Sequence, residues 1–166
     1  MRLFMSTFKS LPKKGSLIIG LLVFVLDQLS KFWVLEHVGP GEIVHVFPCL
    51  NFMLAYNPGV TFGLLRAYSN MHYILLVAGV CALSCIVTVW WWRAENALQR
   101  YATAIILFGA LGNLVDRLRF RAVVDFIDFH IHGWHWYTFN LADSAIVLGV
   151  GLLMLDSFYK PKNTFM

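Results

Sequence analysis

The sequence predicts an all-α integral membrane protein with four transmembrane helices and a small extracytoplasmic platform of β-strands. Hydrophobic residues make up 59% of the 166 residues and charged residues only 13%, unlike an average soluble domain. Four apolar stretches approach the roughly 20 residues that a helix needs to cross a bilayer. They are residues 16–35, 71–92, 101–118 and 139–158. The segments between them are too short for a second domain, so we expect residues 1–166 to form a single membrane-embedded domain.

The first apolar stretch could be a cleaved secretory signal, because basic residues precede it. However, Asp27, Gln28 and Lys31 stand where a small-residue cleavage site would be expected, so we predict a retained helix. Asp27 and Lys31 are also four residues apart, with the acid first, which allows an ion pair on one helix face. A mutually neutralising pair and a functional role are both open.

The segment 36–70 follows, and we place it outside the cytoplasm. Residues 42–47 and 50–56 are rich in Val, Ile, Phe and Tyr and are separated by Pro48, a pattern typical of two strands. Residues 57–59, Asn-Pro-Gly, favour a turn, because Pro restricts φ and Gly accepts a positive φ.

The distribution of Lys and Arg predicts the orientation in the membrane. An even number of spans places both termini on one side, and eight of the 13 Lys and Arg residues lie there. By the positive-inside rule that side is cytoplasmic. The net charge of +4 therefore reflects topology, and we expect no nucleic-acid partner.

The third span carries polar residues on a face with two glycines. Gly109, Gly112, Asn113 and Asp116 share this face, and Arg117 lies beside it. The glycines favour close packing of a neighbouring helix, and Asn113 could bridge such a contact. Asp116 and Arg117, at the membrane boundary, could orient other groups or bind lipid phosphate.

The segment 119–138, also placed outside the cytoplasm, contains Asp125 within a Val-Val-Asp-Phe run. Trp134, Trp136 and Tyr137 follow, and we expect these rings to form an aromatic belt at the membrane interface. The fourth span then opens with Asn140 and Asp143. An acid in a first helical turn is stabilised by the helix dipole, so a simple capping role for Asp143 is one interpretation.

A second interpretation pairs Asp143 with Asp125, 18 residues earlier, at the same outer edge of the membrane. Two carboxyl groups held close together cannot both ionise easily, so one keeps a proton while the other is charged. The charged carboxylate can take a proton from water, and the protonated one can donate to a peptide carbonyl. The pair would titrate as a unit.

A metal hydrolase is a rival prediction. His130, His132 and His135 follow Asp125 and Asp128, and such side chains can bind zinc. In a segment with this many aromatic residues, the same histidines also suit the membrane surface, without a metal.

A transporter or channel is a rival of another class. Asp27, Lys31, Asp116 and Asp143 could line a polar pathway through the membrane. Four short spans without inverted repeats argue against the usual transporter design.

Five ordered motifs together resemble the lipoprotein signal peptidase family, also called type II signal peptidases. The motifs are Asp-Gln-Leu-Ser-Lys at 27–31, Asn-Pro-Gly-Val-Thr-Phe-Gly at 57–63, Gly-Ala-Leu-Gly-Asn-Leu-Val-Asp-Arg at 109–117, Val-Val-Asp-Phe at 123–126 and Phe-Asn-Leu-Ala-Asp-Ser-Ala at 139–145. They cover most of the chain. Pro58 and Thr61 stand where smaller residues are common in the family, which affects only the detail of that loop.

This resemblance implies an aspartic endopeptidase that removes the signal peptide of a prolipoprotein, just before a cysteine that carries diacylglycerol. It implies Asp125 and Asp143 as the catalytic pair, no metal or other cofactor, and a location in the bacterial inner membrane with the site near the outer face. We expect a monomer whose partners are prolipoproteins and membrane lipids. The residues implied to shape or support the site are Asp27, Lys31, Asn57, Gly59, Gly109, Asn113, Asp116, Arg117, Asn140 and Ala142. Residues 42–63 would form a clamp over the substrate.

Overall fold

The structure, a computed structural model, describes residues 13–59 and 69–159. It contains four long helices, α2 (Lys13–His37), α3 (Asn70–Arg93), α4 (Ala97–Phe120) and α5 (Leu141–Tyr159). Within the described residues, all four are long and apolar enough to cross a membrane, with hydropathies between 1.2 and 2.3. The predicted spans are thus confirmed as helices. Residues 60–63 of the second motif and of the expected clamp lie outside the described residues.

The helix ends follow local hydrogen bonding. Asn96 caps α4 by accepting the backbone N–H of Gln99 at 2.9 Å. Before α5, the side chain of Asn140 accepts the N–H of Asp143 at 2.9 Å in the same manner. Phe139, predicted to open this helix, instead exchanges backbone hydrogen bonds with Ile127 (2.8 and 3.1 Å). The helix therefore begins two residues later than predicted.

A four-stranded antiparallel sheet lies at one end of the bundle, in the order β1-β2-β3-β4. Strands β1 (Ile43–Phe47) and β2 (Leu50–Asn57) confirm the two predicted strands. Strands β3 (Val123–Ile131) and β4 (Trp134–His135) lie in the segment 119–138, for which no strands were predicted. The sheet is therefore larger than expected, and its third strand carries Asp125.

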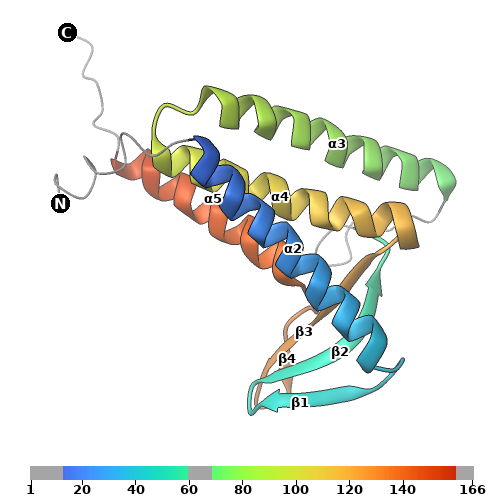
Figure 1. Cartoon of the computed structure of the whole chain (residues 1–166). Helices are drawn as coiled ribbons and strands as arrows, with labels where there is room; N and C mark the ends of the chain where they lie inside the picture. Colours follow the sequence, from blue (N-terminus) through green and yellow to red (C-terminus); the bar gives the residue numbers. More distant parts are fainter. Residues whose placement is uncertain (1–12, 60–68, 160–166) are drawn as a thin grey trace, which may run out of the picture.

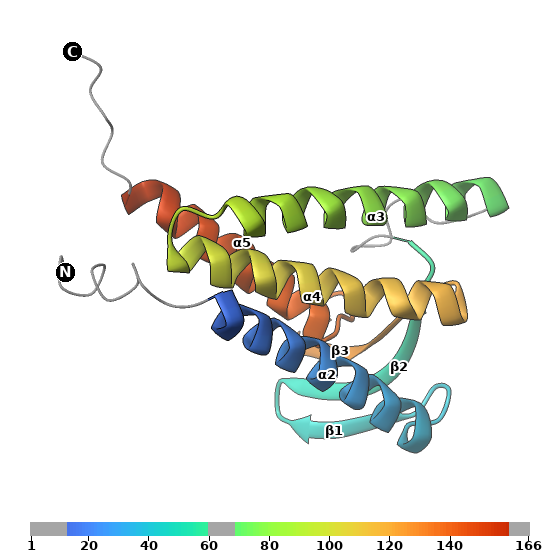
Figure 2. The same ribbon diagram turned by 45° about the horizontal axis from the view of Figure 1, so that its top comes forward.

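Helix α4 is central, because it packs against α2, α3 and α5 and also contacts β3. Figures 1 and 2 show α3 on one side of α4 and α2 on the other, with the sheet beside the end of α2. Val34 and Val38 of α2 bury their side chains against Phe126 of β3, which fixes the sheet to the bundle.

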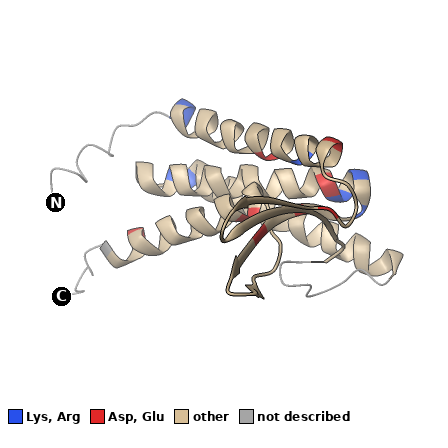
Figure 3. Cartoon of the chain, turned by 90° about the horizontal axis from the view of Figure 1, so that it is seen from below, with Lys and Arg blue, Asp and Glu red and all other residues tan. Residues whose placement is uncertain are grey.

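The outer helix α3 is mostly exposed. Among its residues only Ser84 and Trp91 are buried, and large side chains such as Met71 and Trp92 are 63% and 65% exposed. Few charged residues interrupt the helices (Figure 3). A wide apolar surface of this kind suits hydrocarbon as its solvent.

Candidate active site

Two carboxyl groups approach the same point from different elements. Asp125 lies on β3, where it pairs with Ala55 of β2, and Asp143 lies in the first turn of α5. Asn140 joins them, since its amide nitrogen donates to Oδ1 of Asp125 at 2.6 Å and its oxygen accepts the N–H of Asp143 at 2.9 Å. Asp125 is only 2% exposed. The two predicted catalytic residues are thus neighbours in space, while their catalytic role stays a prediction.

The other oxygen of Asp125 accepts a hydrogen bond from the amide nitrogen of Asn57 at 3.1 Å. The orientation of this amide follows from its second partner, because its oxygen accepts the N–H of Gly59 at 3.0 Å. Arg117 of α4 in turn donates to the carbonyl oxygens of Gly59 (3.0 Å) and Asn113 (3.1 Å). The bend at residues 57–59 is therefore tied to both α4 and Asp125.

Asn113 of α4 plays the same part for the second carboxyl group. Its amide nitrogen donates to Oδ1 of Asp143 at 2.8 Å. Its oxygen accepts from Nζ of Lys31 at 3.0 Å and from the amide of Asn140 at 3.1 Å. Because a cation and an amide donor fill the oxygen, the nitrogen must face Asp143.

A buried ion cluster lies beneath the pair. Lys31 lies 2.8 Å from Asp27, as the sequence predicts, and also 2.8 Å from Asp116. The remaining carboxylate oxygen of Asp27 accepts the N–H of Ala142 at 2.9 Å. Asp116 accepts the N–H of Val124 at 3.2 Å. Each acid thus holds the backbone directly beside one member of the aspartate pair.

The glycines of α4 allow its neighbours to approach closely. A β-carbon on Gly112 would lie 2.5 Å from Oδ2 of Asp27, and one on Gly109 would lie 2.9 Å from the carbonyl oxygen of Ala142. Both distances are shorter than ordinary van der Waals contact. The close packing predicted for these glycines is therefore present, and it involves both α2 and α5.

Sequence reasoning missed Gln28 and Tyr73. The amide nitrogen of Gln28 lies 3.2 Å from Asp27, 3.3 Å from Asp116 and 3.3 Å from the carbonyl oxygen of Gly112. The hydroxyl of Tyr73 donates to the carbonyl oxygen of Arg117 at 3.0 Å. Gln28 sits beside Asp27 in the first motif, so its position was the available signal. Tyr73 offers no signal in the sequence.

The electrostatic environment of this site favours protonation of one of its carboxyl groups. The buried network contains four acids and two bases, a net charge of −2 if all are ionised: Asp27, Asp116, Asp125, Asp143, Lys31 and Arg117. Burial, followed by the negative charge of Asp143, raises the pKa of Asp125 to about 7, although the amides of Asn57 and Asn140 act in the opposite direction. A proton is therefore available to the pair near neutral pH.

A second polar cluster lies on the sheet with different partners. Asp128 accepts from the amide of Asn51 at 2.8 Å and lies 2.8 Å from Nδ1 of His135. The amide oxygen of Asn51 is 2.8 Å from Nδ1 of His45. Burial acts to raise the pKa of Asp128, but the hydrogen bonds from His135 and Asn51 outweigh it and the pKa lies below its usual value. Asp128 is thus satisfied separately from Asp125.

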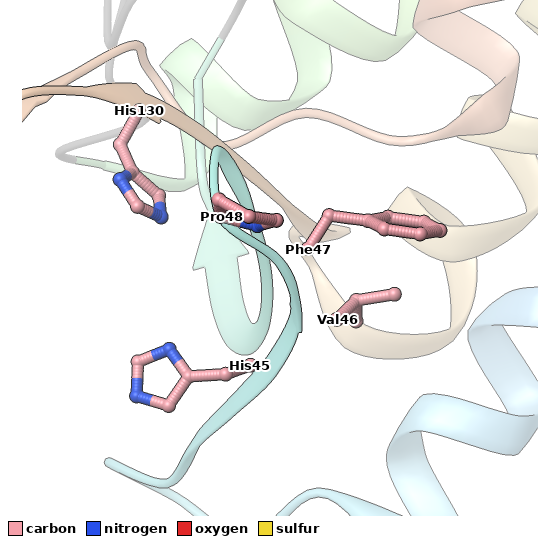
Figure 4. Close-up of a pocket in the computed structure, with 5 residues that line it drawn as sticks. All are labelled: His45, Val46, Phe47, Pro48 and His130. Atoms are coloured by element: carbon pink, nitrogen blue, oxygen red, sulfur yellow. The ribbon is translucent and has the colours of Figure 1, made fainter.

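The histidines of the rival metal-site prediction make other contacts. The ring of His130 stacks on that of His135 at 5.0 Å, and His132 occupies the left-handed turn before β4 at φ 49°. In the parts of the chain that the structure describes, no three His, Cys, Asp or Glu side chains are grouped as a metal would require. A surface pocket of about 330 Å³ borders His45 and His130 (Figure 4), and its lining includes neither member of the aspartate pair nor any of the residues predicted to support that pair.

The arrangement supports acid–base chemistry on a carboxyl pair of which Asp125 is buried and Asp143 is half-buried. One carboxyl can hold a proton while its neighbour is charged, and three asparagine amides orient both groups. Such a pair can activate water against a carbonyl carbon.

Comparison with known sequences identifies relatives along most of the chain. A family described as signal peptidase (SPase) II matches residues 19–159. A lipoprotein signal peptidase of Beijerinckia indica subsp. indica is 44% identical over 140 residues, which cover 82% of this chain and 83% of the relative. A lipoprotein signal peptidase of Coxiella burnetii (strain Dugway 5J108-111) is 39% identical over 161 residues, covering 96% of this chain and 99% of the relative.

Two solved structures, each described as a bacterial membrane enzyme, share the fold. One matches with a TM-score of 0.82 at 25% identity and covers 96% of this chain and 98% of its own. The other matches with a TM-score of 0.78 at 26% identity, covering 89% of this chain and 95% of its own.

Proposed function

Because this chain belongs to the signal peptidase II family, we propose that it is an aspartic endopeptidase acting on diacylglyceryl-modified prolipoproteins. It removes the signal peptide by cleaving just before the lipidated cysteine. The observation that carries this proposal is the placement of Asn140, which joins Asp125 to the first turn of α5 beside Asp143.

The proposed reaction proceeds in two steps through a tetrahedral intermediate. The ionised aspartate takes a proton from water as the water oxygen bonds to the peptide carbonyl carbon, and the protonated aspartate gives its proton to the carbonyl oxygen. The C–N bond then breaks. A carboxyl proton passes to the leaving nitrogen, and the intermediate's hydroxyl proton returns to the pair. This leaves a new carboxyl group on the signal peptide and a free amine on the cysteine.

The remaining predicted residues position this pair in our proposal. Asn57, Asn113 and Asn140 orient the carboxyl groups through their amides. The others shape the site through the ion cluster, the bend at residues 57–59 and the close contacts of α4: Asp27, Lys31, Gly59, Gly109, Asp116, Arg117 and Ala142. No metal or other cofactor takes part.

The chain is a bacterial membrane protein, and we place it in the inner membrane as a single domain that works as a monomer, with both termini in the cytoplasm. The sheet and the aspartate pair then lie near the outer face. A lipid-bearing peptide could reach this site laterally, with its acyl chains remaining in hydrocarbon beside exposed apolar helices.

Strands β1 and β2 belong to the segment 42–63 that we propose as a clamp over the substrate. If the clamp must move during the reaction, a disulfide that fixes β1 to a helix should slow cleavage.

The test is cleavage of a diacylglyceryl-modified prolipoprotein by purified protein in detergent with a chelator present. The parent should cleave it, whereas Asp125→Asn and Asp143→Asn should not. Asp128→Asn is the matched control, because Asp128 is equally buried on the same strand but belongs to the separate cluster. An active Asp125→Asn or Asp143→Asn variant would refute the pair, inhibition by the chelator would favour a metal hydrolase, and an inactive parent would favour the transporter.

A further inference from the structure

The ammonium group of Lys31 is surrounded by three acceptors. It lies 2.8 Å from Asp27, 2.8 Å from Asp116 and 3.0 Å from the amide oxygen of Asn113. An ammonium group has three N–H donors, so each donor has its own partner. The residue is only 2% exposed, which means that water does not compete for these donors.

Each of the three acceptors is connected to the aspartate pair by a further hydrogen bond. Asp27 accepts the N–H of Ala142, the residue before Asp143. Asp116 accepts the N–H of Val124, the residue before Asp125. The third acceptor, Asn113, donates directly to Oδ1 of Asp143. Three separate routes thus lead from one nitrogen atom to the two carboxyl groups.

We infer that Lys31 is the positioning residue of the aspartate pair. Through Asp27, Asp116 and Asn113 it keeps the carboxyl groups of Asp125 and Asp143 in a fixed position relative to each other. This inference rests on the proposed function. The ammonium group of Lys31 bonds to Asp27, Asp116 and Asn113, so it acts on Asp125 and Asp143 through these partners and not on the reacting atoms.

The compact ammonium group of Lys suits position 31 better than the planar guanidinium group of Arg would. The three acceptors come from two helices and surround a single nitrogen, whereas a guanidinium group would spread its donors over a flat fork. Gln28 adds a neutral donor to the same two acids. Those acids carry a charge of −2 against the single +1 of Lys31, so its replacement by an apolar residue leaves buried charge uncompensated.

The charges facing the pair come from two helices, with Lys31 and Asp27 on α2 and Asp116 and Arg117 on α4. The positive charge of Lys31 lowers the pKa of Asp125. Loss of that charge should therefore raise the pKa of Asp125 and move the rate profile to higher pH. A charge-matched variant separates this electrostatic effect from positioning.

The experiment compares Lys31→Met, Lys31→Met with Asp116→Asn, and Lys31→Arg on a diacylglyceryl-modified prolipoprotein. The double variant keeps the net charge of the cluster, since it removes one positive and one negative charge. We expect both Met variants to lose kcat by about 10²-fold with KM little changed, because small misplacements of reacting groups have effects of this size. The profile should shift upward in pH for Lys31→Met and much less for the double variant.

Lys31→Arg keeps the charge and preserves folding if the Met variants do not fold. It should also lose kcat with KM unchanged, because a planar group cannot satisfy all three acceptors. A parent-like kcat in folded Lys31→Arg or in the folded double variant would overturn the inference and leave Lys31 a charge-balancing residue. Asp125→Asn is assayed beside them, so that a failure of the Lys31 inference can be distinguished from a failure of the proposed function. If that variant were active, the proposed function itself would fail.

Discussion

The amide nitrogen of Asn140 lies 2.6 Å from Oδ1 of Asp125, and its orientation is set by the oxygen of the same amide, which accepts a backbone N–H of α5. The side chain of Asn140 therefore fixes the distance between β3 and the start of α5.

Replacement of Asn140 by Leu should abolish most activity. Removing a hydrogen-bond donor from a charged or reacting group costs about 10²-fold or more in rate. The measurement is kcat of the folded variant on a diacylglyceryl-modified prolipoprotein. Asn96→Leu is the matched control, because Asn96 donates at 2.8 Å to the buried carboxyl group of Asp156, which belongs neither to the aspartate pair nor to the proposed clamp. Equal loss of activity in both variants would contradict a specific role for Asn140.

Replacement of Asn57 by Ala should change the pH dependence of kcat/KM. The amide of Asn57 lowers the pKa of Asp125, which burial and Asp143 have raised to about 7, so removal of this amide should raise that pKa further. If Asp125 is ionised in the active form, only the acidic limb moves to higher pH. If Asp125 carries the proton, only the basic limb moves. A profile with neither limb displaced would show that Asn57 does not act on the pair.

Replacement of Gly112 by Ala should destabilise the bundle. The new β-carbon would lie 2.5 Å from Oδ2 of Asp27, so either this carboxylate must leave its contacts with Lys31 and Ala142 or α4 must move away from α2, at a cost of about 1–3 kcal/mol. Thermal unfolding in detergent measures this change. Gly151→Ala on α5 is the control, because nothing lies within 4 Å of the β-carbon it would carry. The prediction fails if both variants unfold at the same temperature as the parent.

Replacement of Asp156 by Ala should affect stability and not chemistry. Asp156 is 4% exposed and accepts from Asn96 at 2.8 Å and Gln99 at 2.6 Å, which joins α5 to the start of α4. Its loss leaves the buried amide of Gln99 and the half-buried amide of Asn96 without their acceptor, at a cost of about 1–3 kcal/mol. Thermal unfolding should show the loss, while kcat of the folded protein stays near that of the parent. A large fall in kcat would contradict a purely structural role.

The helices and the first two strands were predictable because their signals are local. Length and hydropathy define the spans, and the Val, Ile, Phe and Tyr residues of two short runs separated by Pro48 indicate β1 and β2. The ion pair of Asp27 and Lys31 was predictable for the same reason, since both residues lie on one helix.

The rest of the site depends on contacts that carry no sequence signal. Asp27 binds the backbone N–H of Ala142, and any residue type other than proline supplies that group. Strand β3 was missed because its pairing with β2 joins segments more than 60 residues apart, with register shifts that a local pattern does not reveal. The partnership of Asp156 with Asn96 and Gln99 joins distant segments in the same way.

The separation of 115 residues between Asp27 and Ala142 has a consequence for biosynthesis. The first helix enters the membrane long before its partner on α5 has been synthesised, yet its acid already has a neutralising base one turn away. The first helix of the nascent chain can therefore reside in the bilayer without an unpaired charge on Asp27. The aspartate pair exists only after the last helix is inserted, so an unfinished chain carries no assembled hydrolase.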